Sequence, residues 1–214
     1  MDLEQKSSVN EVSSALLHRL PKYHNYLCKL REHGETYISS AKIAEDMMLN
    51  PVLVRKDIAQ ISSTPGKPRL GFEINALVKD FDVFLGYNNE NKAILVGAGN
   101  LGKALMSYTG FSKYGLDIVA AFDNNPSTQR YIINNKKILP IERMKEIVEK
   151  YNIDLGIITV PASEAQNVCD AMVEAGIKGI LNFAPVHIDA PENIVIQEDN
   201  IAVSLALVAM KIRI

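Results

Sequence analysis

The stretch that most constrains the fold is KAILVGAGNLGKALMSY, residues 92–108. An apolar, strand-like run is followed by a glycine-rich turn and then by a helix-like segment. Gly97, Gly99 and Gly102 match G-x-G-x-x-G. In that pattern the first glycine permits a tight turn, the second lets the backbone approach a pyrophosphate, and the third lets the helix pack on the strand. The stretch therefore predicts a phosphate-binding turn whose helix N-terminus attracts negative charge.

The residues that follow alternate between apolar strands and amphipathic helices. Strands are expected in LDIVAAF, DLGIITV and IKGILNF, and helices in IERMKEIVEKY and SEAQNVCDAMVEAG. Continuous apolar strands separated by helices indicate a parallel sheet that is covered on both faces. The predicted fold class is α/β, with a doubly wound parallel-sheet Rossmann domain over residues 86–198.

The end of the strand LDIVAAF completes the dinucleotide pattern. Asp123 follows this strand, about 20 residues after Gly102, as in dinucleotide-binding domains. An acid there accepts hydrogen bonds from the ribose hydroxyls of adenosine and repels a 2′-phosphate. The predicted cofactor is NAD(H) rather than NADP(H). A nucleotide-free Rossmann-like domain with tight-turn glycines is the alternative.

The first part of the chain, residues 1–85, has a helical pattern instead. We expect a helix over residues 9–32 with a kink or break at Pro21, and a serine-capped helix in ISSAKIAEDM. Asn50 and Pro51 form a good N-cap and first-turn pair for a third helix, PVLVRKDIAQI. The Pro- and Gly-rich SSTPGKPRLGF then predicts a loop or short hairpin. This order of elements is that of a winged helix-turn-helix.

A helical wheel divides the third helix into two sides. The side expected to face the core carries Pro51, Val54, Ile58 and Ile61. The opposite side carries Val52, Lys56 and Gln60, with Arg55 on the flank, and Lys67 and Arg69 lie at the tip of the hairpin. Lys and Gln can donate to base edges in a major groove and Arg can hold a phosphate. The alternative is an ordinary solvated face of a small helical bundle.

Charge is distributed unevenly along the chain. Residues 13–69 hold nine basic and five acidic side chains, whereas the whole chain has a net charge of −2. A basic first third favours an anionic partner for that part alone. Cys28 and Cys169 are far apart and have no CxxC partner, so neither a disulfide framework nor a metal site is predicted. With no signal-peptide pattern and no apolar run of about 18 residues, the expected location is the cytoplasm.

The last segment, NIAVSLALVAMKIRI, is apolar almost all the way round as a helix. Ser204 is the only polar residue between Ile201 and Met210. Such a helix must bury every face, and one domain offers only one groove. Residues 199–214 are therefore predicted to bridge the two subunits of a homodimer, by swapping. A simple buried core helix is the alternative.

Chemistry at the cofactor is not indicated, and we predict that the chain is not an enzyme. A hydride-transfer enzyme needs a general acid or base beside the nicotinamide. His187 follows a strand end without an acid at a signature spacing, and the chain is too short to add a substrate domain. A small NAD-dependent dehydrogenase, using Tyr108 or His187 as its acid, remains the alternative from the enzyme class. A CoA-binding Rossmann module is the second alternative, because fold does not fix the ligand.

Taken together, the chain resembles the Rex family of redox-sensing transcriptional repressors, over nearly its whole length. The segments that carry this resemblance are RLPKYHNYL, ISS, VRKDI, VGAGNLGKAL, YTGF, VAAFDNNP, TVPASEAQ and AGIKGILNFAPV. The resemblance implies a homodimer with an N-terminal winged helix, a Rossmann core and a swapped C-terminal helix. It also implies binding to a palindromic, AT-rich operator in double-stranded DNA, and release by NADH but not by NAD⁺.

The motifs and the resemblance together assign three sets of residues. The DNA-binding set is Ser39, Ser40, Val52, Arg55, Lys56, Gln60, Lys67 and Arg69. The cofactor set from the turn and the strand end is Gly97, Ala98, Gly99, Asn100, Leu101, Gly102 and Asp123. For the nicotinamide end, the resemblance adds Tyr108, Thr159, Val160, Pro161, Asn182, Phe183 and Ala184. It also implies that Asp199, at the start of the swapped helix, takes part in the switch.

Three departures from the family pattern bear on that switch. The family usually reads YYRYL where this chain has YHNYL, so Asn25 replaces an arginine that couples the DNA-binding domain to the cofactor site. The wing lacks the aromatic residues usual in the family. Asn200 follows Asp199 where an apolar or aromatic residue is usual. The hypothesis is a repressor whose NADH response is weakened or differently wired.

Overall fold

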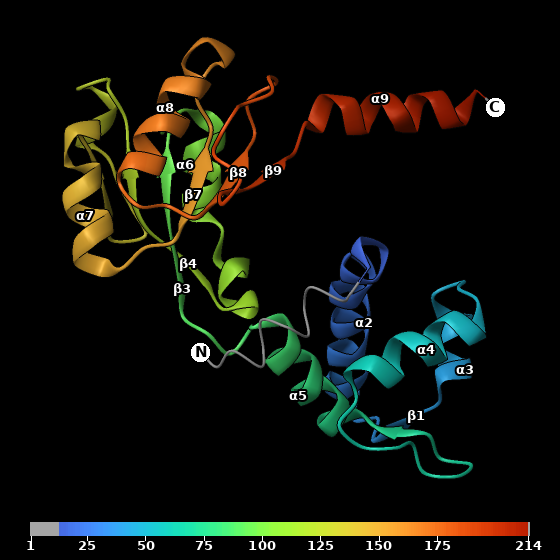
Figure 1. Cartoon of the computed structure of the whole chain (residues 1–214). Helices are drawn as coiled ribbons and strands as arrows, with labels where there is room; N and C mark the ends of the chain where they lie inside the picture. The colour runs from blue at the N-terminus through green and yellow to red at the C-terminus, as the bar shows by residue number, and fades with distance from the viewer. Residues whose placement is uncertain (1–12, 214) are drawn as a thin grey trace. The chain divides into compact units, whose positions relative to one another are not determined.

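The computed structural model describes residues 13–213, and Figure 1 shows their helices and strands. The chain divides into two compact units, the first ending at residue 88 and the second beginning at residue 89. The first unit is mostly helical and the second alternates strands with helices. The predicted α/β class, with a helical part before a parallel-sheet part, is confirmed.

The first unit contains four described helices and two short strands. They are α2 (Ser14–Glu32), β1 (Tyr37–Ile38), α3 (Ser40–Asp46), α4 (Pro51–Ile61), β2 (Phe72–Glu73) and α5 (Ile74–Leu85). Ser39 and Asn50 are the N-caps of α3 and α4, as their sequence positions predict. The strands β1 and β2 pair antiparallel.

The sequence expectation for the first helix needs correction in part. Helix α2 is one continuous helix through Pro21, so the expected break does not occur. Buried Leu16, Leu20 and Leu27 hold the turns on both sides of Pro21 in the core, and this packing outweighs the lost backbone hydrogen bond. The expected helix start at residues 9–12 lies outside the described residues. Helix α5 was not predicted, and it completes the core of the unit.

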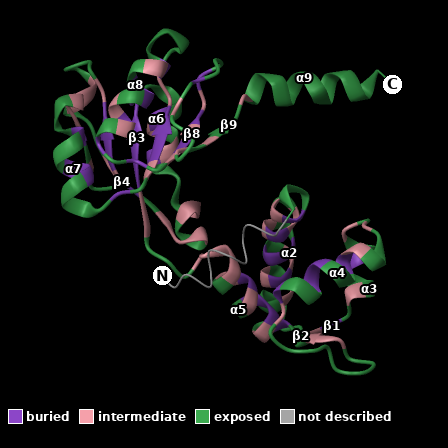
Figure 2. Ribbon diagram, in the orientation of Figure 1, coloured by how far each residue is buried: buried purple, intermediate pink, exposed green. Residues whose placement is uncertain are grey.

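That core is a single cluster formed by α2, α3, α4 and α5. Its largest fully buried side chains include Tyr23 and Phe81, whose rings meet edge to face with centroids 6.4 Å apart. Figure 2 shows buried residues running along one side of each of α2 and α4, with exposed residues on the other. The first unit therefore closes its hydrophobic core within one chain.

The wing is a short hairpin that returns to β1. Lys67 and Gly71 exchange two backbone hydrogen bonds, of 2.7 and 2.9 Å. Gly71 has φ +85°, and a Cβ there would lie 2.2 Å from the Ile38 carbonyl oxygen. Only glycine allows this approach of the wing to β1. The expected short hairpin with Lys67 and Arg69 near its tip is confirmed.

The second unit is built on a seven-stranded sheet in the order β5-β6-β4-β3-β7-β8-β9. The strands are β3 (Asn91–Val96), β4 (Leu116–Phe122), β5 (Ile132–Ile133), β6 (Lys136–Leu139), β7 (Leu155–Ile158), β8 (Gly179–Asn182) and β9 (Val195–Glu198). All neighbouring pairs are parallel except β5 with β6, which forms an antiparallel edge. The hairpin β5–β6 and the strand β9 were not predicted.

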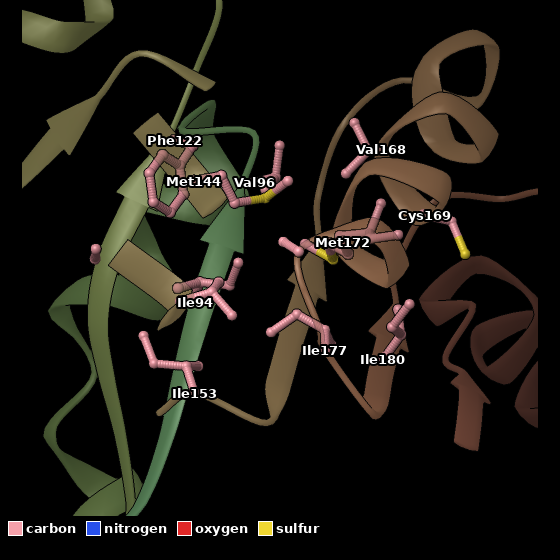
Figure 3. Close-up of a cluster of buried hydrophobic side chains, with 14 of the residues drawn as sticks. Ile94, Val96, Phe122, Met144, Ile153, Val168, Cys169, Met172, Ile177 and Ile180 are labelled. Carbon is pink, nitrogen blue, oxygen red and sulfur yellow. The ribbon is translucent and has the colours of Figure 1, made fainter. Parts of the chain in front are cut away.

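Helices cover both faces of the sheet, as a doubly wound fold requires. The helices are α6 (Asn100–Ser107), α7 (Met144–Tyr151) and α8 (Ala162–Glu174). Figure 3 shows one buried cluster in which Ile94 and Val96 of β3 lie near Met144 of α7 and Val168 of α8. A second cluster packs Met106 of α6 against the other face of β3 and β4. The parallel sheet covered on both faces is confirmed.

The covering is incomplete beside β7, β8 and β9. An open groove of about 250 Å³ lies there, lined mostly by apolar side chains that include Ile157, Leu181 and Val195. The sheet therefore retains an apolar surface that no helix of the same unit covers in the described residues.

The C-terminal helix α9 (Ile201–Ile212) makes no use of that groove within its own chain. All its residues are exposed, and Figure 2 draws it in the colour of exposed residues from end to end. The alternative of a buried core helix is therefore wrong for this structure. Among residues 13–213, no helix combines the length and the apolar character needed to span a lipid bilayer.

Candidate functional site

Helix α4 presents a polar, basic side and a buried apolar side. Val54, Ile58 and Ile61 are buried, as the wheel predicts. The residues predicted to read DNA are all exposed: Val52, Arg55, Lys56 and Gln60. Pro51 is exposed as well, contrary to the wheel, because it lies in the first turn, where the helix has only begun to approach the core.

A buried ion pair fixes the orientation of α4 on α2. The Arg19 guanidinium donates to both carboxylate oxygens of Asp57, over 2.7 and 3.0 Å. The Tyr23 hydroxyl donates to Asp57 Oδ2 over 2.8 Å. Asp57 is 2% exposed, and this buried carboxylate accepts three hydrogen bonds, two at Oδ2 and one at Oδ1. Sequence analysis did not predict this hydrogen-bond network, because its partners lie more than 30 residues apart.

The same network shifts the pKa of its members. The hydrogen bond to Asp57 raises the pKa of Arg19. Burial, and then the hydrogen bond to Asp57, raises the pKa of Tyr23 to about 12. Arg19 therefore stays charged and Tyr23 stays a neutral donor across the physiological range. The exposed basic side of α4 is therefore held, through its buried side, by hydrogen bonds from Arg19 and Tyr23.

The remaining predicted DNA contacts come from α3 and the wing. The Ser39 hydroxyl accepts from the Lys42 N–H over 3.1 Å as the cap of α3, and Ser40 opens that helix. The Lys67 ammonium donates to the Tyr37 hydroxyl over 2.8 Å, which raises the pKa of Lys67. Arg69 is exposed with φ +66° in the wing turn. All eight predicted residues therefore lie in the first unit, on α3, α4 and the wing.

In the second unit, a pocket of about 420 Å³ lies at the carboxyl ends of β3, β4 and β7. Six of the predicted cofactor residues line it: Gly97, Gly99, Asp123, Thr159, Val160 and Pro161. Five further lining residues, which sequence analysis missed as site residues, are Val96, Asn124, Ile141, Glu164 and Val168. In the strand order, the chain crosses from one side of β3 to the other between β4 and β7. Open α/β sheets bind ligands at such a switch point.

The glycines of the turn differ in what they do. Gly97 has φ +101°, and a Cβ on it would lie 2.7 Å from the Thr159 carbonyl oxygen. A Cβ on Gly102 would lie 2.1 Å from the Gly97 carbonyl oxygen. A Cβ on Gly99 would meet nothing within 4 Å. The fold therefore requires Gly97 and Gly102, whereas Gly99 leaves open space beside the pocket where a pyrophosphate would pass.

Hydrogen bonds place the groups around this turn. Asp123 Oδ2 accepts from the Ala98 N–H, and Oδ1 accepts from the Asn125 N–H, both over 2.8 Å. Each carboxylate oxygen keeps a second acceptor site, which can serve a ribose hydroxyl. The Thr159 hydroxyl donates to the Gly97 carbonyl oxygen over 2.7 Å and so holds the turn. Gly99 caps α6 without a side chain, so no cap covers the N–H groups at the start of that helix.

Four residues predicted for the nicotinamide end do not line this pocket. Tyr108 stacks edge to face on Phe111 and lines a separate pocket of about 220 Å³. Asn182 is fully buried; its Nδ2 donates to the Val186 carbonyl oxygen and its Oδ1 accepts from the Ala184 N–H. Ala184 is buried too, and Phe183 packs against the cluster beneath α6. In this structure, Asn182 shapes the loop that follows β8.

The two predicted switch residues lie in different units. Asn25 is an exposed residue of α2. Asp199 donates its N–H to the Asn182 carbonyl oxygen over 2.9 Å, and Asn200 then caps α9. Asn200 therefore replaces the usual apolar residue with an N-cap. His187 does have an acid partner, Glu198 at 2.8 Å, but the imidazole is exposed.

Comparisons with known proteins match both parts of the chain. A model described as a CoA binding domain matches residues 88–186, and one described as a putative DNA-binding protein N-terminus matches residues 11–59. The redox-sensing transcriptional repressor Rex of Carboxydothermus hydrogenoformans is 38% identical over 95% of this chain and 97% of its own length. Rex of Bacteroides fragilis is 36% identical over 95% of this chain and 92% of its own.

Solved structures agree over nearly the whole chain. RSP, a Rex-family repressor, in complex with β-NAD⁺ and operator DNA is similar with a TM-score of 0.89 at 31% identity, covering 94% of this chain and 92% of that one. RSP in complex with β-NADH gives a TM-score of 0.85 at 31% identity, covering 94% of each chain. With relatives this similar over its whole length, the chain belongs to the Rex family of redox-sensing transcriptional repressors.

Proposed function

We propose that this chain represses transcription by binding a palindromic, AT-rich operator as a homodimer, and that NADH releases it. The observation that carries the proposal is the coexistence, in one chain, of an exposed recognition helix and a dinucleotide pocket at the switch point of a parallel sheet. His187, a candidate acid of the dehydrogenase alternative, is exposed and does not line this pocket. The reported relatives are named as repressors rather than as enzymes.

At the operator, α4 would enter the major groove. Arg55 would hold a phosphate, while Lys56 and Gln60 would donate to base edges. Ser39, Ser40, Lys67 and Arg69 would contact the flanking backbone from α3 and the wing. Two recognition helices in a dimer would then read half-sites about one helical turn apart. The excess of basic side chains over residues 13–69, nine against five acidic ones, supports this assignment.

At the cofactor pocket, the turn at Gly97–Gly99 and the start of α6 would hold the pyrophosphate, and Asp123 would accept from the ribose. Val160 and Ile141 offer apolar surface for adenine. The predicted nicotinamide residues Tyr108, Asn182, Phe183 and Ala184 would meet the cofactor in an arrangement that includes the partner subunit. The uncharged reduced ring enters an apolar interface more readily than the cation of NAD⁺, which is costly to desolvate.

The proposed homodimer would cover apolar surfaces that the second unit leaves exposed. Helix α9 exposes seven large apolar residues, and an apolar groove lies open beside β7, β8 and β9. A contiguous apolar surface of this kind marks an interaction site. We infer that α9 of one subunit packs against the partner. NADH would act by favouring one of two arrangements of such a dimer, through its different affinity for them. The cytoplasm, where operator and cofactor are both present, is the proposed location.

Asn25 sets the expected strength of the response. An amide on α2 cannot form the ion pair with the Asp199 position that the family arginine would form. We therefore expect NADH to release the operator less completely in this chain. The reciprocal variant Asn25→Arg should increase the ratio of operator affinities measured without and with NADH. Full release of the native chain at micromolar NADH would contradict this expectation.

The test is fluorescence anisotropy with labelled AT-rich palindromic duplexes and the purified full chain, at stated salt, with NAD⁺, NADH or CoA added. Release by NADH but not by NAD⁺ would support the whole proposal. If neither NAD⁺ nor NADH changes the affinity for the duplex, the DNA-binding part of the proposal stands and the redox-sensing part fails. Release by CoA alone would favour the CoA-binding alternative. A failure to bind any duplex, combined with NADH turnover, would favour the dehydrogenase.

A further inference from the structure

One exposed side chain on the recognition side of α4 does not fit a role in hydrogen bonding. Val52 is 59% exposed, although its neighbours Arg55 and Lys56 on the same helix are charged. It lies opposite the buried Val54 and Ile58, so it contributes nothing to the core. A single exposed valine needs no explanation on an ordinary surface. Here it lies in the first turn of the helix, which is where helix-turn-helix proteins contact base edges.

The backbone of Val52 is not available to DNA. The Asn50 side-chain oxygen accepts from the Val52 N–H over 2.8 Å and from the Leu53 N–H over 3.3 Å. This cap uses the N–H groups that an uncapped helix start would offer to a phosphate. Val52 can therefore act on DNA only through its two methyl groups. Such a group gains free energy only by contact with another apolar group.

The position of these methyl groups is well fixed. Pro51 and the Asn50 cap set the first turn, and the buried Arg19–Asp57 pair holds the helix from behind. A β-branched valine has one strongly preferred rotamer in a helix. Within the major groove, the apolar group that base pairs present is the C5-methyl of thymine. A rigid valine beside hydrogen-bonding Lys56 and Gln60 therefore suits a T·A pair next to the bases that those residues read.

We propose that Val52 is a specificity-determining residue that recognises a thymine in each half-site through the thymine C5-methyl group. The inference rests on the proposed DNA binding and adds the chemical feature that is read. It predicts that the repressor prefers thymine over uracil at one position of each half-site. Uracil lacks this methyl group and pairs with adenine in the same way, so only the apolar contact is removed.

The experiment begins by selecting a duplex from a random pool with the purified full-length protein. The thymines of the selected duplex are then replaced by uracil one symmetric pair at a time, and anisotropy gives the affinity for each duplex. One methyl contact is worth about fourfold in affinity, from about 0.8 kcal/mol per buried carbon, and two half-sites give about 15-fold. We expect a loss of this size at one symmetric pair of positions and a smaller one elsewhere.

Variants separate this contact from other effects of uracil on DNA. In Val52→Ala, the affinities for the thymine and uracil duplexes should become nearly equal at that position, which is the coupling that a double-mutant cycle isolates. The matched control is Val83→Ala, an exposed valine on α5 of the same unit, which should keep the native thymine preference. Val52→Thr keeps the shape of the side chain and one methyl group, and should retain part of the preference.

The outcomes distinguish this inference from the function on which it rests. If no duplex is enriched, the proposed operator binding fails and the inference fails with it. If a duplex is enriched but the uracil series is flat, operator binding stands and thymine recognition is overturned. If a thymine preference is present and Val52→Ala leaves it unchanged, another residue reads the methyl group and the assignment to Val52 is wrong.

Discussion

The two units of the chain differ in how far each completes its own structure. In the first unit, α2 to α5 enclose one core, and even the buried Asp57 has partners from the same unit. In the second unit, two clusters fill both sides of the central strands, but the groove beside β7, β8 and β9 and the whole of α9 stay uncovered. The first unit should therefore be stable by itself, whereas the second should gain stability from a partner.

The units also differ in which atoms make the site. The predicted DNA-reading side of α4 consists of exposed side chains on a helix whose other side is buried in a closed core. The predicted cofactor pocket includes main chain at Gly97 and Gly99, where a side chain would intrude, together with polar side chains such as Asp123 and Glu164. Removing atoms should damage the first site, and adding atoms should damage the second.

The largest effect is expected from a charge on α9. Leu205 is 69% exposed, so Leu205→Lys should leave the folding of an isolated subunit unchanged. If α9 is buried against a partner, two unpaired ammonium groups would enter an apolar interface, at a cost on the order of 5 kcal/mol. Sedimentation velocity should then show monomer where the native chain is a dimer. Ile132→Lys, on an equally exposed apolar residue of β5, is the control that should stay dimeric. A dimeric Leu205→Lys protein would show that α9 does not bridge subunits.

The next contrast lies within the glycine turn. Gly102→Ala should lower the free energy of unfolding by on the order of 3 kcal/mol, because its Cβ would lie 2.1 Å from the Gly97 carbonyl oxygen. Gly99→Ala should unfold like the native chain, since its Cβ meets nothing within 4 Å. It should nevertheless bind NADH about tenfold or more weakly, because the methyl group fills the pyrophosphate path. Urea unfolding and NADH titration separate the two effects. If Gly99→Ala binds NADH as tightly as the native chain does, the pyrophosphate does not bind at this turn.

Sequence patterns located the parts of both units that depend on local chemistry. The strands β3, β4, β7 and β8, the caps Ser39 and Asn50, and the glycine turn each follow from residues close together in the chain. Helix α5 has apolar residues at helical spacing, Ile74, Leu77, Val78 and Phe81, but it lacks a capping side chain, and it was missed. Strand β9 has four residues with little burial, so it lacks the apolar run by which buried strands are recognised.

Tertiary contacts account for the rest. The Arg19–Asp57 pair joins helices that are separated in sequence, and nothing near either residue indicates its partner. Asn182 is the last residue of an apolar strand and begins the segment NFAPV. Its side-chain amide hydrogen-bonds to the backbone of the loop that follows this strand. Ile141 and Glu164 reach the pocket only because β4 and β7 lie on either side of β3. The glycine motif therefore predicts the turn of the pocket, whereas the order of the strands in the sheet determines which other residues line it.

The third prediction concerns the hydrogen bonds that Arg19 and Tyr23 donate to the buried Asp57 in the first unit. Tyr23→Phe should lower stability at neutral pH by about 1 kcal/mol, the value of one lost hydrogen bond. In the native chain, the folded-state pKa of Tyr23 is about 12 against an ordinary 10.0, so its stabilising contribution is present below pH 10 and lost as the pH rises toward 12. That loss amounts to about 2–3 kcal/mol.

Urea unfolding midpoints measured from neutral to alkaline pH test this expectation. The native curve should fall through the Tyr23→Phe curve above pH 10, because the native chain loses more stability there than its lead of about 1 kcal/mol and the variant has no phenol to ionise at this position. Tyr151→Phe, on an exposed tyrosine of α7, should run parallel to the native chain over the whole range. Curves for native and Tyr23→Phe protein that stay parallel into the alkaline range would show that Tyr23 ionises as freely in the folded state as in the unfolded one.

The smallest effect compares two helix caps of the same geometry. Asn50 accepts from the N–H groups two and three residues ahead, over 2.8 and 3.3 Å, and Asn200 does so over 3.0 and 3.2 Å. Removing such a cap costs about 1 kcal/mol where the helix is packed. Asn50→Ala should therefore lower the stability of the first unit by that amount at every protein concentration, and Asn50→Ser should restore most of it. Every residue of α9 is exposed in the described part of the second unit, so Asn200→Ala should act only through the dimer.

The expected result is a loss of stability in Asn200→Ala that depends on protein concentration, because the cap stabilises a helix whose packing requires a second subunit. Unfolding midpoints measured over a wide range of concentration provide the test. If both alanine variants lose stability equally at all concentrations, α9 is packed within its own subunit, and the second unit is as complete as the first. If only Asn200→Ala varies with concentration, the same cap chemistry serves folding in one unit and assembly in the other.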